Sequence, residues 1–261
     1  MMPSPELKIA ILQIPLAWEA VNQNLEKIEQ QLDAITHTDI VLLPEMFSTG
    51  FTMNRSLAQA ADYAPLQWMI NQSQKHGFAL AGSYMIHEED KYYNRFSFVY
   101  PDGKVCSYNK KHLFSMAEES HYFTPGSERV MLSFKGWRVA LFVCYDLRFP
   151  VWNRRTPNFD YDLALYSANW PERRSLAWRS LLPARAIENQ SFVAAANRIG
   201  LDGHHILHSG DSMILSPIGK PIAVAPAFTP VVLEATLRYD TLEQIRQNLP
   251  FFNDRDSFTL N

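Results

Sequence analysis

Three residues whose side chains could together attack a carbonyl group each come at the end of a short segment with strand character: Glu45, Lys110 and Cys144. In open α/β sheets, catalytic groups collect at the carboxyl ends of the strands, where the next loop bounds a pocket. A cysteine thiol needs a nearby base or cation to act as a nucleophile at neutral pH. A carboxylate and an ammonium group could supply both, so these residues predict nucleophilic catalysis if the fold brings them together.

Each of the three residues also has an ordinary structural explanation. Free cysteine is among the most buried residue types, so Cys144 could simply fill the core. Glu45 could be an exposed carboxylate after a strand, and the Lys110-Lys111 pair could be two surface lysines. Cys106 lies in a predicted hairpin strand with no basic residue in view, and we interpret it as a bystander. Residue type and placement alone leave both explanations open.

The segments that must position these residues alternate between strand and helix patterns. Short apolar runs predict strands at residues 7–14, 39–43, 78–84, 137–143, 161–167, 191–197, 211–215 and 231–236. Helical spacing predicts helices at 18–35, 57–76, 172–189 and 241–248. Hairpins are expected from 92–100 to 104–108 and from 211–215 to 222–224. This alternation in two halves predicts a layered α/β protein in which helices cover mixed sheets.

Details of the helices and of the chain end complete this prediction. Gly77 is expected to cap the helix that precedes it, and Pro183 either kinks its helix or marks its first turn. The even composition indicates a single domain over residues 1–261. Residues 250–261 lack any periodicity and are expected to form a C-terminal arm, either frayed or packed on a partner subunit.

Composition narrows the classes of function. The 261 residues are 47% apolar and 20% charged, which excludes disorder over the whole chain. The net charge of −3 gives no attraction to phosphate backbones or anionic lipid, so no nucleic-acid or membrane partner is expected. Two cysteines without CxxC spacing fit a reducing compartment. With no apolar block long enough for a signal peptide or a membrane span, we expect a cytoplasmic protein.

Three sequence blocks resemble, in the right order, those of the nitrilase superfamily of carbon–nitrogen hydrolases. They are LLPEMF at 42–47, YNKKHLF at 108–114 and VCYDLRFP at 143–150. The second block has the form K-x-H-L-F and places the family's lysine at Lys110 rather than Lys111. Glu119 with TPG at 124–126, ANWP at 168–171 and ARAIENQ at 184–190 also match. The resemblance therefore covers nearly the whole chain, from about Lys8 to the last strand.

Within the superfamily, finer cues are most similar to the omega-amidases of the 2-oxoglutaramate amidase type. These cues are MFSTGFTMN, HLFSMAEE, CYDLRFPVW and SANWPERRSLAW. The resemblance implies a four-layer α-β-β-α sandwich that forms a homodimer, with a Glu–Lys–Cys triad and no metal or organic cofactor. It implies hydrolysis of the terminal amide of a small α-keto-ω-amide, through a thioester, to a dicarboxylate and ammonia.

The resemblance also implies a role for each residue of the site. Glu45 is expected to take and return protons, Cys144 to attack the carbonyl carbon and Lys110 to stabilise the oxyanion. The backbone N–H of Tyr145 would be the second oxyanion donor. Glu119 is expected to orient Lys110 or the substrate amide; the alternative is an exposed carboxylate at a helix end.

The remaining expectations concern substrate binding. The substrate carboxylate would suit an arginine fork, and Arg148, Arg173 and Arg174 are equal candidates. Aromatic and sulfur-containing side chains are candidate pocket walls: Phe47, Phe51, Met53, Tyr145, Phe149 and Trp170. The cluster of His204, His205 and His208 could in principle hold a metal, but oppositely directed side chains in a strand disfavour this. His112 is expected to hold the lysine loop by hydrogen bonds.

Two other classes of function remain open on sequence grounds. The chain could be another carbon–nitrogen hydrolase with the same triad, such as an N-carbamoyl hydrolase, an aliphatic amidase or a nitrilase. It could also be a non-catalytic binding protein on the same fold, since fold does not imply function. A papain-type Cys–His enzyme lacks support, because no CGSCW-like block surrounds Cys144.

Overall fold

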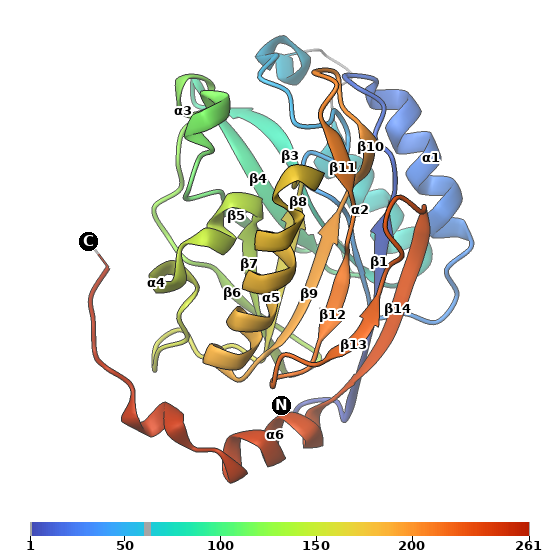
Figure 1. The fold of residues 1–261 in the computed structure, drawn as a ribbon. Coiled ribbons are helices and arrows are strands. Elements are labelled where there is room, and N and C mark those ends of the chain that lie inside the picture. The colour runs from blue at the N-terminus through green and yellow to red at the C-terminus, as the bar shows by residue number, and fades with distance from the viewer. Residues whose placement is uncertain (1, 60–63, 261) are drawn as a thin grey trace.

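Two six-stranded mixed sheets lie face to face in the computed structural model, which describes residues 2–59 and 64–260 (Figure 1). The first sheet has the order β14 (Val231–Arg238), β1 (Glu6–Gln13), β2 (Ile40–Leu42), β3 (Ala79–Glu88), β4 (Lys91–Val99) and β5 (Val105–Asn109). The second has the order β13 (Pro221–Val224), β12 (Met213–Leu215), β9 (Phe192–Asn197), β8 (Leu163–Ala168), β7 (Trp137–Val143) and β6 (Met131–Phe134). Because β1 pairs with β14, strands from both ends of the chain belong to one sheet.

Three parallel strands form the centre of each sheet: β1, β2 and β3 in the first, and β7, β8 and β9 in the second. Such strands are buried on both faces, and their sequences are correspondingly near-continuous apolar runs. The inner faces of the two sheets meet in one core that includes Ile9, Leu42, Val139 and Leu165. The carboxyl ends of β2 and β8 meet across the two sheets, where the Glu45 N–H donates to the Ala168 carbonyl at 3.3 Å.

Helices cover the outer faces of both sheets. The helices α1 (Val21–Asp33) and α2 (Pro65–His76) pack on the first sheet through Ile28, Leu32 and Met69. The second sheet is covered by α5 (Ser175–Asn189). The remaining elements are β10 (Ile199–Leu201) and β11 (Leu207–Ser209), which form a small ladder, and the helices α3 (Glu119–Tyr122), α4 (Pro150–Asn153) and α6 (Tyr239–Asn248). The predicted four-layer α-β-β-α sandwich is confirmed.

One predicted helix begins later than expected, and one of the two alternatives for Pro183 is excluded. The helix predicted at 57–76 begins only at Pro65, since proline suits a first helical turn; residues 55–59 form a separate 3₁₀ turn, and residues 60–63 lie outside the described residues. Its expected cap is confirmed, with Gly77 at φ +74°. Pro183 lies inside α5 rather than in its first turn. Burial of Trp178 and Leu182 holds this helix against the sheet despite a cost of about 3 kcal/mol for an interior proline.

Some short elements were not predicted, because three- and four-residue strands carry little periodicity. These are β6, β10 and β11. In the expected C-terminal arm, Phe251–Asp254 form a 3₁₀ turn whose Phe252 is buried 3.6 Å from the Arg155 guanidinium of the same chain. Across the described ranges, no helix is long and apolar enough to cross a membrane.

Candidate active site

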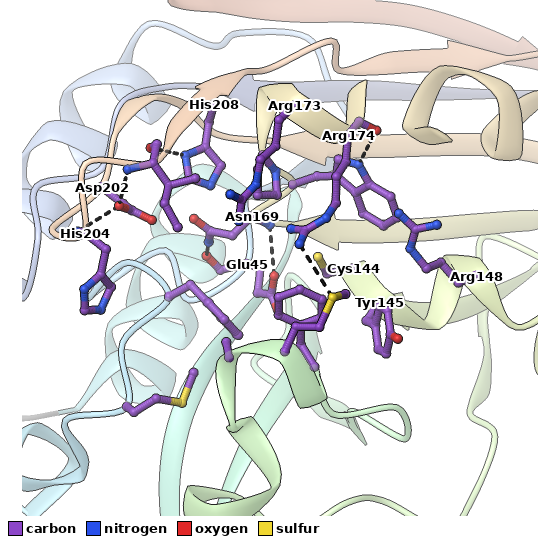
Figure 2. Close-up of a pocket in the computed structure, with 18 of the residues that line it drawn as sticks. Glu45, Cys144, Tyr145, Arg148, Asn169, Arg173, Arg174, Asp202, His204 and His208 are labelled. Carbon is purple, nitrogen blue, oxygen red and sulfur yellow. Dashed lines mark hydrogen bonds between the residues drawn. The ribbon is translucent and has the colours of Figure 1, made fainter. Parts of the chain in front are cut away.

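A cavity of about 290 Å³ opens at the edge where β2, β5, β7 and β8 end. Glu45, Lys110 and Cys144 all line it, so the fold brings together the three residues that the sequence singled out. In Figure 2, Arg173 and Arg174 lie above Glu45 and Cys144, while Asp202 and His204 lie on the side away from Arg148. We call Glu45, Lys110, Glu119 and Cys144 the floor cluster, and Arg148, Arg173 and Arg174 the arginine rim.

Glu45 is fully buried and is held on both carboxylate oxygens. It follows β2 after Pro44, in a turn where Met46 adopts φ +46°. Its Oε1 accepts hydrogen bonds from the Lys110 ammonium at 2.8 Å and from the Asn94 amide at 2.8 Å, and its Oε2 accepts one from the Asn169 N–H at 2.9 Å. The interpretation as an exposed carboxylate therefore fails at this position, and the group has one fixed orientation.

Lys110 is a buried cation between two carboxylates. Only 1% of the side chain is exposed, and its Nζ lies 2.8 Å from Glu45 and 2.9 Å from Glu119. Burial by itself would lower the lysine pKa, but the charges of Glu119 and Glu45 outweigh it and raise the pKa above its usual value. The ammonium therefore stays charged in a water-poor site, where its electrostatic effect is strongest.

Glu119 lies behind Lys110, at the start of the one-turn helix α3, and is fully buried. Its carboxylate accepts hydrogen bonds from Lys110 at 2.9 and 3.1 Å, from Asn94 at 3.2 Å and from the Phe114 N–H at 2.5 Å. Burial raises the pKa of Glu119, and the Lys110 charge opposes this shift. The sequence alternative of an exposed helix-end carboxylate does not describe this environment.

Cys144 begins a 3₁₀ turn directly after β7 and adopts φ +41°, a conformation that non-glycine residues rarely occupy. Burial, followed by the nearby Glu45 charge, raises the pKa of this thiol well above its usual value, and Lys110 only partly opposes the shift. In the resting site the sulfur therefore keeps its proton, and the carboxylate that could remove it lines the same cavity.

Two asparagines, to which the sequence analysis assigned no role, hydrogen-bond to carboxylates of the floor cluster. Asn94, from β4, donates from one amide nitrogen to both Glu45 and Glu119. Asn169 follows β8 and holds Glu45 through two donors, its backbone N–H and its side-chain amide. Asn169 was visible only as part of the ANWP block, and Asn94 only as one of several polar residues in a predicted hairpin strand.

All three rim arginines line the cavity, but in different settings. The Arg148 guanidinium lies over the Trp170 ring at 4.7 Å, and that of Arg174 over the Phe114 ring at 5.0 Å. Burial, together with the Arg173 and Arg148 charges, lowers the pKa of Arg174. Within the described part of the chain, none of the three forms an ion pair with a carboxylate. The rim thus gathers three cations around one opening.

The expected pocket walls divide into two groups. Phe51, Met53, Tyr145 and Trp170 line the cavity, and Phe51 packs 5.1 Å from the Lys110 ammonium. The other two candidates do not line it: Phe47 packs beside Trp68 and Tyr84 in the core, and Phe149 stacks on His112 at 3.7 Å. Both lie near Glu45 or Cys144 in sequence, but their rings pack against other side chains instead of the cavity.

The three clustered histidines also separate. His204 and His208 line the cavity, whereas His205 does not. The His208 Nδ1 lies 3.0 Å from the Ile206 carbonyl, and burial followed by the Arg198 charge lowers the pKa of His208 to about 4. Among residues 2–59 and 64–260, no group of three His, Cys, Asp or Glu side chains is placed to hold a metal ion.

Comparison with known proteins agrees with this geometry. The carbon-nitrogen hydrolase family pattern matches residues 8–247, so the chain belongs to the carbon-nitrogen hydrolase family. It is 44% identical over 256 residues to the omega-amidase YafV of Escherichia coli (98% of this chain, 99% of that one). It is 31% identical to the 2-oxoglutaramate amidase of Bacillus subtilis (94% and 96%). The solved structure of XC1258 from Xanthomonas campestris, a CN-hydrolase superfamily protein, superposes with a TM-score of 0.93 at 37% identity, covering 98% and 99% of the two chains.

Proposed function

We propose that this protein is an omega-amidase that hydrolyses the terminal amide of small α-keto-ω-amides such as 2-oxoglutaramate. The near full-length similarity to an omega-amidase and to a 2-oxoglutaramate amidase supports this substrate class. The observation that carries the chemistry is the buried contact between Glu45 and Lys110, at 2.8 Å, in the same cavity as the Cys144 thiol. A base, a cation and a nucleophile thus face one enclosed space.

In the proposed reaction, Glu45 takes the thiol proton while the Cys144 sulfur attacks the amide carbon. The raised pKa of the thiol favours this coupled transfer over a preformed thiolate. Glu45 then gives the proton to the leaving nitrogen, ammonia departs and a thioester remains. Glu45 next takes a proton from water, whose oxygen attacks the thioester, and the sulfur recovers a proton as the carboxylate product leaves.

The oxyanion formed in both steps would be stabilised by the Lys110 ammonium and the backbone N–H of Tyr145. Losing one such donor typically lowers the rate by about 10²–10³-fold. Glu119 would keep Lys110 in place, since both of its carboxylate oxygens accept hydrogen bonds from the ammonium. We assign Glu119 to positioning rather than to proton transfer.

The arginine rim supports a substrate that carries a negative charge. Guanidinium groups bind carboxylates through paired hydrogen bonds, and Arg148, Arg173 and Arg174 have no carboxylate partner in the described chain. The apolar walls formed by Phe51, Met53 and Trp170 would accommodate the short carbon chain between the two ends of such a substrate. An amide at one end and a carboxylate at the other fit this division.

The test is ammonia release by the wild type and by Cys144→Ala from five compounds: 2-oxoglutaramate, 2-oxosuccinamate, glutamine, an N-carbamoyl amino acid and an aliphatic nitrile. We expect turnover of the two keto-amides, abolished in Cys144→Ala. Turnover of only another compound would retain the triad and overturn the substrate. A folded wild type that releases no ammonia from any of them would contradict the proposed function.

We further propose a cytoplasmic homodimer. Exposed apolar side chains on α5, at β13 and beside the C-terminal turn offer a surface that a second copy would cover: Leu176, Ile187, Ile222, Val224 and Phe251. Light scattering during size-exclusion chromatography measures the mass of the protein in solution directly. A mass of about 60 kDa is expected from two chains of 30.0 kDa, and a mass near 30.0 kDa would exclude the dimer.

A further inference from the structure

One fully buried carboxylate next to the floor cluster takes no part in the reaction described above. Asp146 lies two residues after Cys144, in the same 3₁₀ turn, and is completely inaccessible. A buried carboxylate is costly unless hydrogen bonds satisfy it. Its partners therefore indicate what this position does for the site.

The two oxygens of Asp146 accept four hydrogen bonds from two separate segments of the chain, residues 108–112 and the end of β7. Oδ1 accepts from the His112 N–H at 3.0 Å and from the His112 Nδ1 at 2.8 Å. Oδ2 accepts from the Tyr108 hydroxyl at 2.7 Å and from the Val143 N–H at 2.9 Å. Tyr108 and His112 lie two residues before and two residues after Lys110, and Val143 directly precedes Cys144. One carboxylate is thus bonded on both sides of the lysine and next to the nucleophile.

The surrounding contacts make this bridge stiff. The Tyr108 hydroxyl, while donating to Asp146, accepts from the Lys111 N–H and from the Trp152 indole, each at 3.1 Å. The His112 ring is held by its stack on Phe149. The bond to Val143 closes the turn in which Cys144 keeps its positive φ. Neither loop can shift by much without breaking several bonds in the same buried region.

We propose that Asp146 is a positioning residue that sets the placement of Cys144 relative to Lys110 and Glu45. Attack by the sulfur and stabilisation of the oxyanion involve groups on two separate loops, and their alignment decides the rate. A displacement of about 1 Å in such a site lowers the rate by about 10²-fold. This inference rests on the proposed function for its kinetic readout, but not for the reactivity of the thiol.

The test is Asp146→Asn, which keeps the shape but turns one acceptor oxygen into an NH₂ group facing two donors. We expect kcat for the amide to fall about 10–100-fold with KM within about threefold of the wild type, because Arg173 and Arg174 lie on a different turn from Asp146. Alkylation of Cys144 by iodoacetamide, followed by mass spectrometry, should slow about tenfold, while Cys106 alkylation stays unchanged.

Asp162→Asn is the matched control. Asp162 is also fully buried and also accepts four hydrogen bonds, three from Arg138 and one from Arg246, but it precedes β8 at the opposite end from the cavity. This control should lower the melting temperature and leave kcat and Cys144 alkylation within about twofold. Equal kinetic losses in the two variants, or no loss in Asp146→Asn, would overturn the proposal.

A milder change guards against misfolding of Asp146→Asn. Tyr108→Phe removes one of the four donors and keeps the ring, so we expect kcat and Cys144 alkylation to fall about threefold to tenfold. Unchanged values for this variant would overturn the inference when Asp146→Asn does not fold. Alkylation needs no substrate, so the two proposals fail in different ways. If the proposed function is wrong, the wild type releases no ammonia. If the role of Asp146 is wrong, the variants alkylate Cys144 as fast as the wild type does.

Discussion

The floor cluster and the arginine rim border the same cavity but treat charge in opposite ways. In the floor cluster, Lys110 is 1% exposed and contacts two carboxylates, each of which is held by further donors. The rim arginines instead stack on aromatic rings or extend toward the opening, with no carboxylate partner in the described residues. Paired ions in a closed site fix geometry, whereas unpaired cations at an opening attract an anion.

Under the proposed function, this difference divides catalysis between two parts of one pocket. Only interactions stronger in the transition state than in the ground state raise kcat, and we expect the floor cluster to make these. Interactions made equally in both states lower KM, and we expect the rim to make these. The predictions below test this division, beginning with the largest expected effect.

Lys110→Met is the most disruptive change, because it removes the charge from the floor cluster but keeps the length of the side chain. If Lys110 is the oxyanion cation, as proposed, its loss should lower kcat about 10²–10³-fold. It also leaves Glu45 and Glu119 facing each other unpaired, so the free energy of unfolding should fall by about 3–5 kcal/mol. Urea denaturation and ammonia release measure the two effects.

The double variant Lys110→Met/Glu119→Gln separates the effect on kcat from the effect on stability. Removing one of the two carboxylates should recover part of the lost free energy of unfolding while leaving the enzyme inactive. A single Lys110→Met variant as stable as the wild type would mean that the buried ion pairs contribute nothing to the fold. Recovery of activity in the double variant would remove Lys110 from the oxyanion site.

The floor cluster was the part most readily predicted from sequence. Glu45 and Cys144 were found because each follows a predicted strand of a parallel set, and Lys110 because it follows the predicted hairpin strand and lies in the K-x-H-L-F block. Asn94 could not be found in this way, because its role depends on a side-chain direction across the sheet from Glu45. The raised pKa of Cys144 was also not predictable, since it arises from burial that the sequence does not specify.

The rim was less predictable, for a physical reason. Sequence placed Arg148, Arg173 and Arg174 near the site but could not rank them, since long side chains on turns can point in several directions. In the structure the Arg148 guanidinium lies over Trp170, while Arg174 is half-buried beside Phe114. Figure 2 shows Arg174 above Cys144 and Arg148 to one side, so Arg174 is the rim cation that we test against a substrate bound at the nucleophile.

His208 also lines the cavity, and its charge, unlike that of the rim arginines, depends on pH. The fold lowers its pKa from 6.5 to about 4, first through burial and then through the Arg198 charge. The unfolded chain therefore binds this proton more readily than the folded chain below pH 6.5. Stability should decrease as the pH falls from about 7 to 4, by roughly 3 kcal/mol from this group, and should not change further below pH 4.

The measurement is the free energy of unfolding at several pH values for the wild type and His208→Gln. The variant should lose this part of the pH dependence. The difference in the free energy of unfolding between the two proteins should therefore narrow as the pH decreases from 7 to 4. His204→Gln is the control, since His204 lines the same cavity but is exposed. Parallel curves for wild type and His208→Gln would show that the ring is not held neutral by the fold.

Arg174→Gln should have the smallest effect, and it separates the rim from the floor cluster most directly. Losing a charged hydrogen bond to the substrate carboxylate should raise KM for 2-oxoglutaramate about tenfold and change kcat by less than about twofold. A neutral amide of the same length should show no change in KM. Arg179→Gln, an exposed arginine on α5, is the control for general loss of positive charge. If Arg174→Gln instead lowered kcat for both substrates equally, Arg174 would act on the reacting centre, and the division between rim and floor cluster would have to be redrawn.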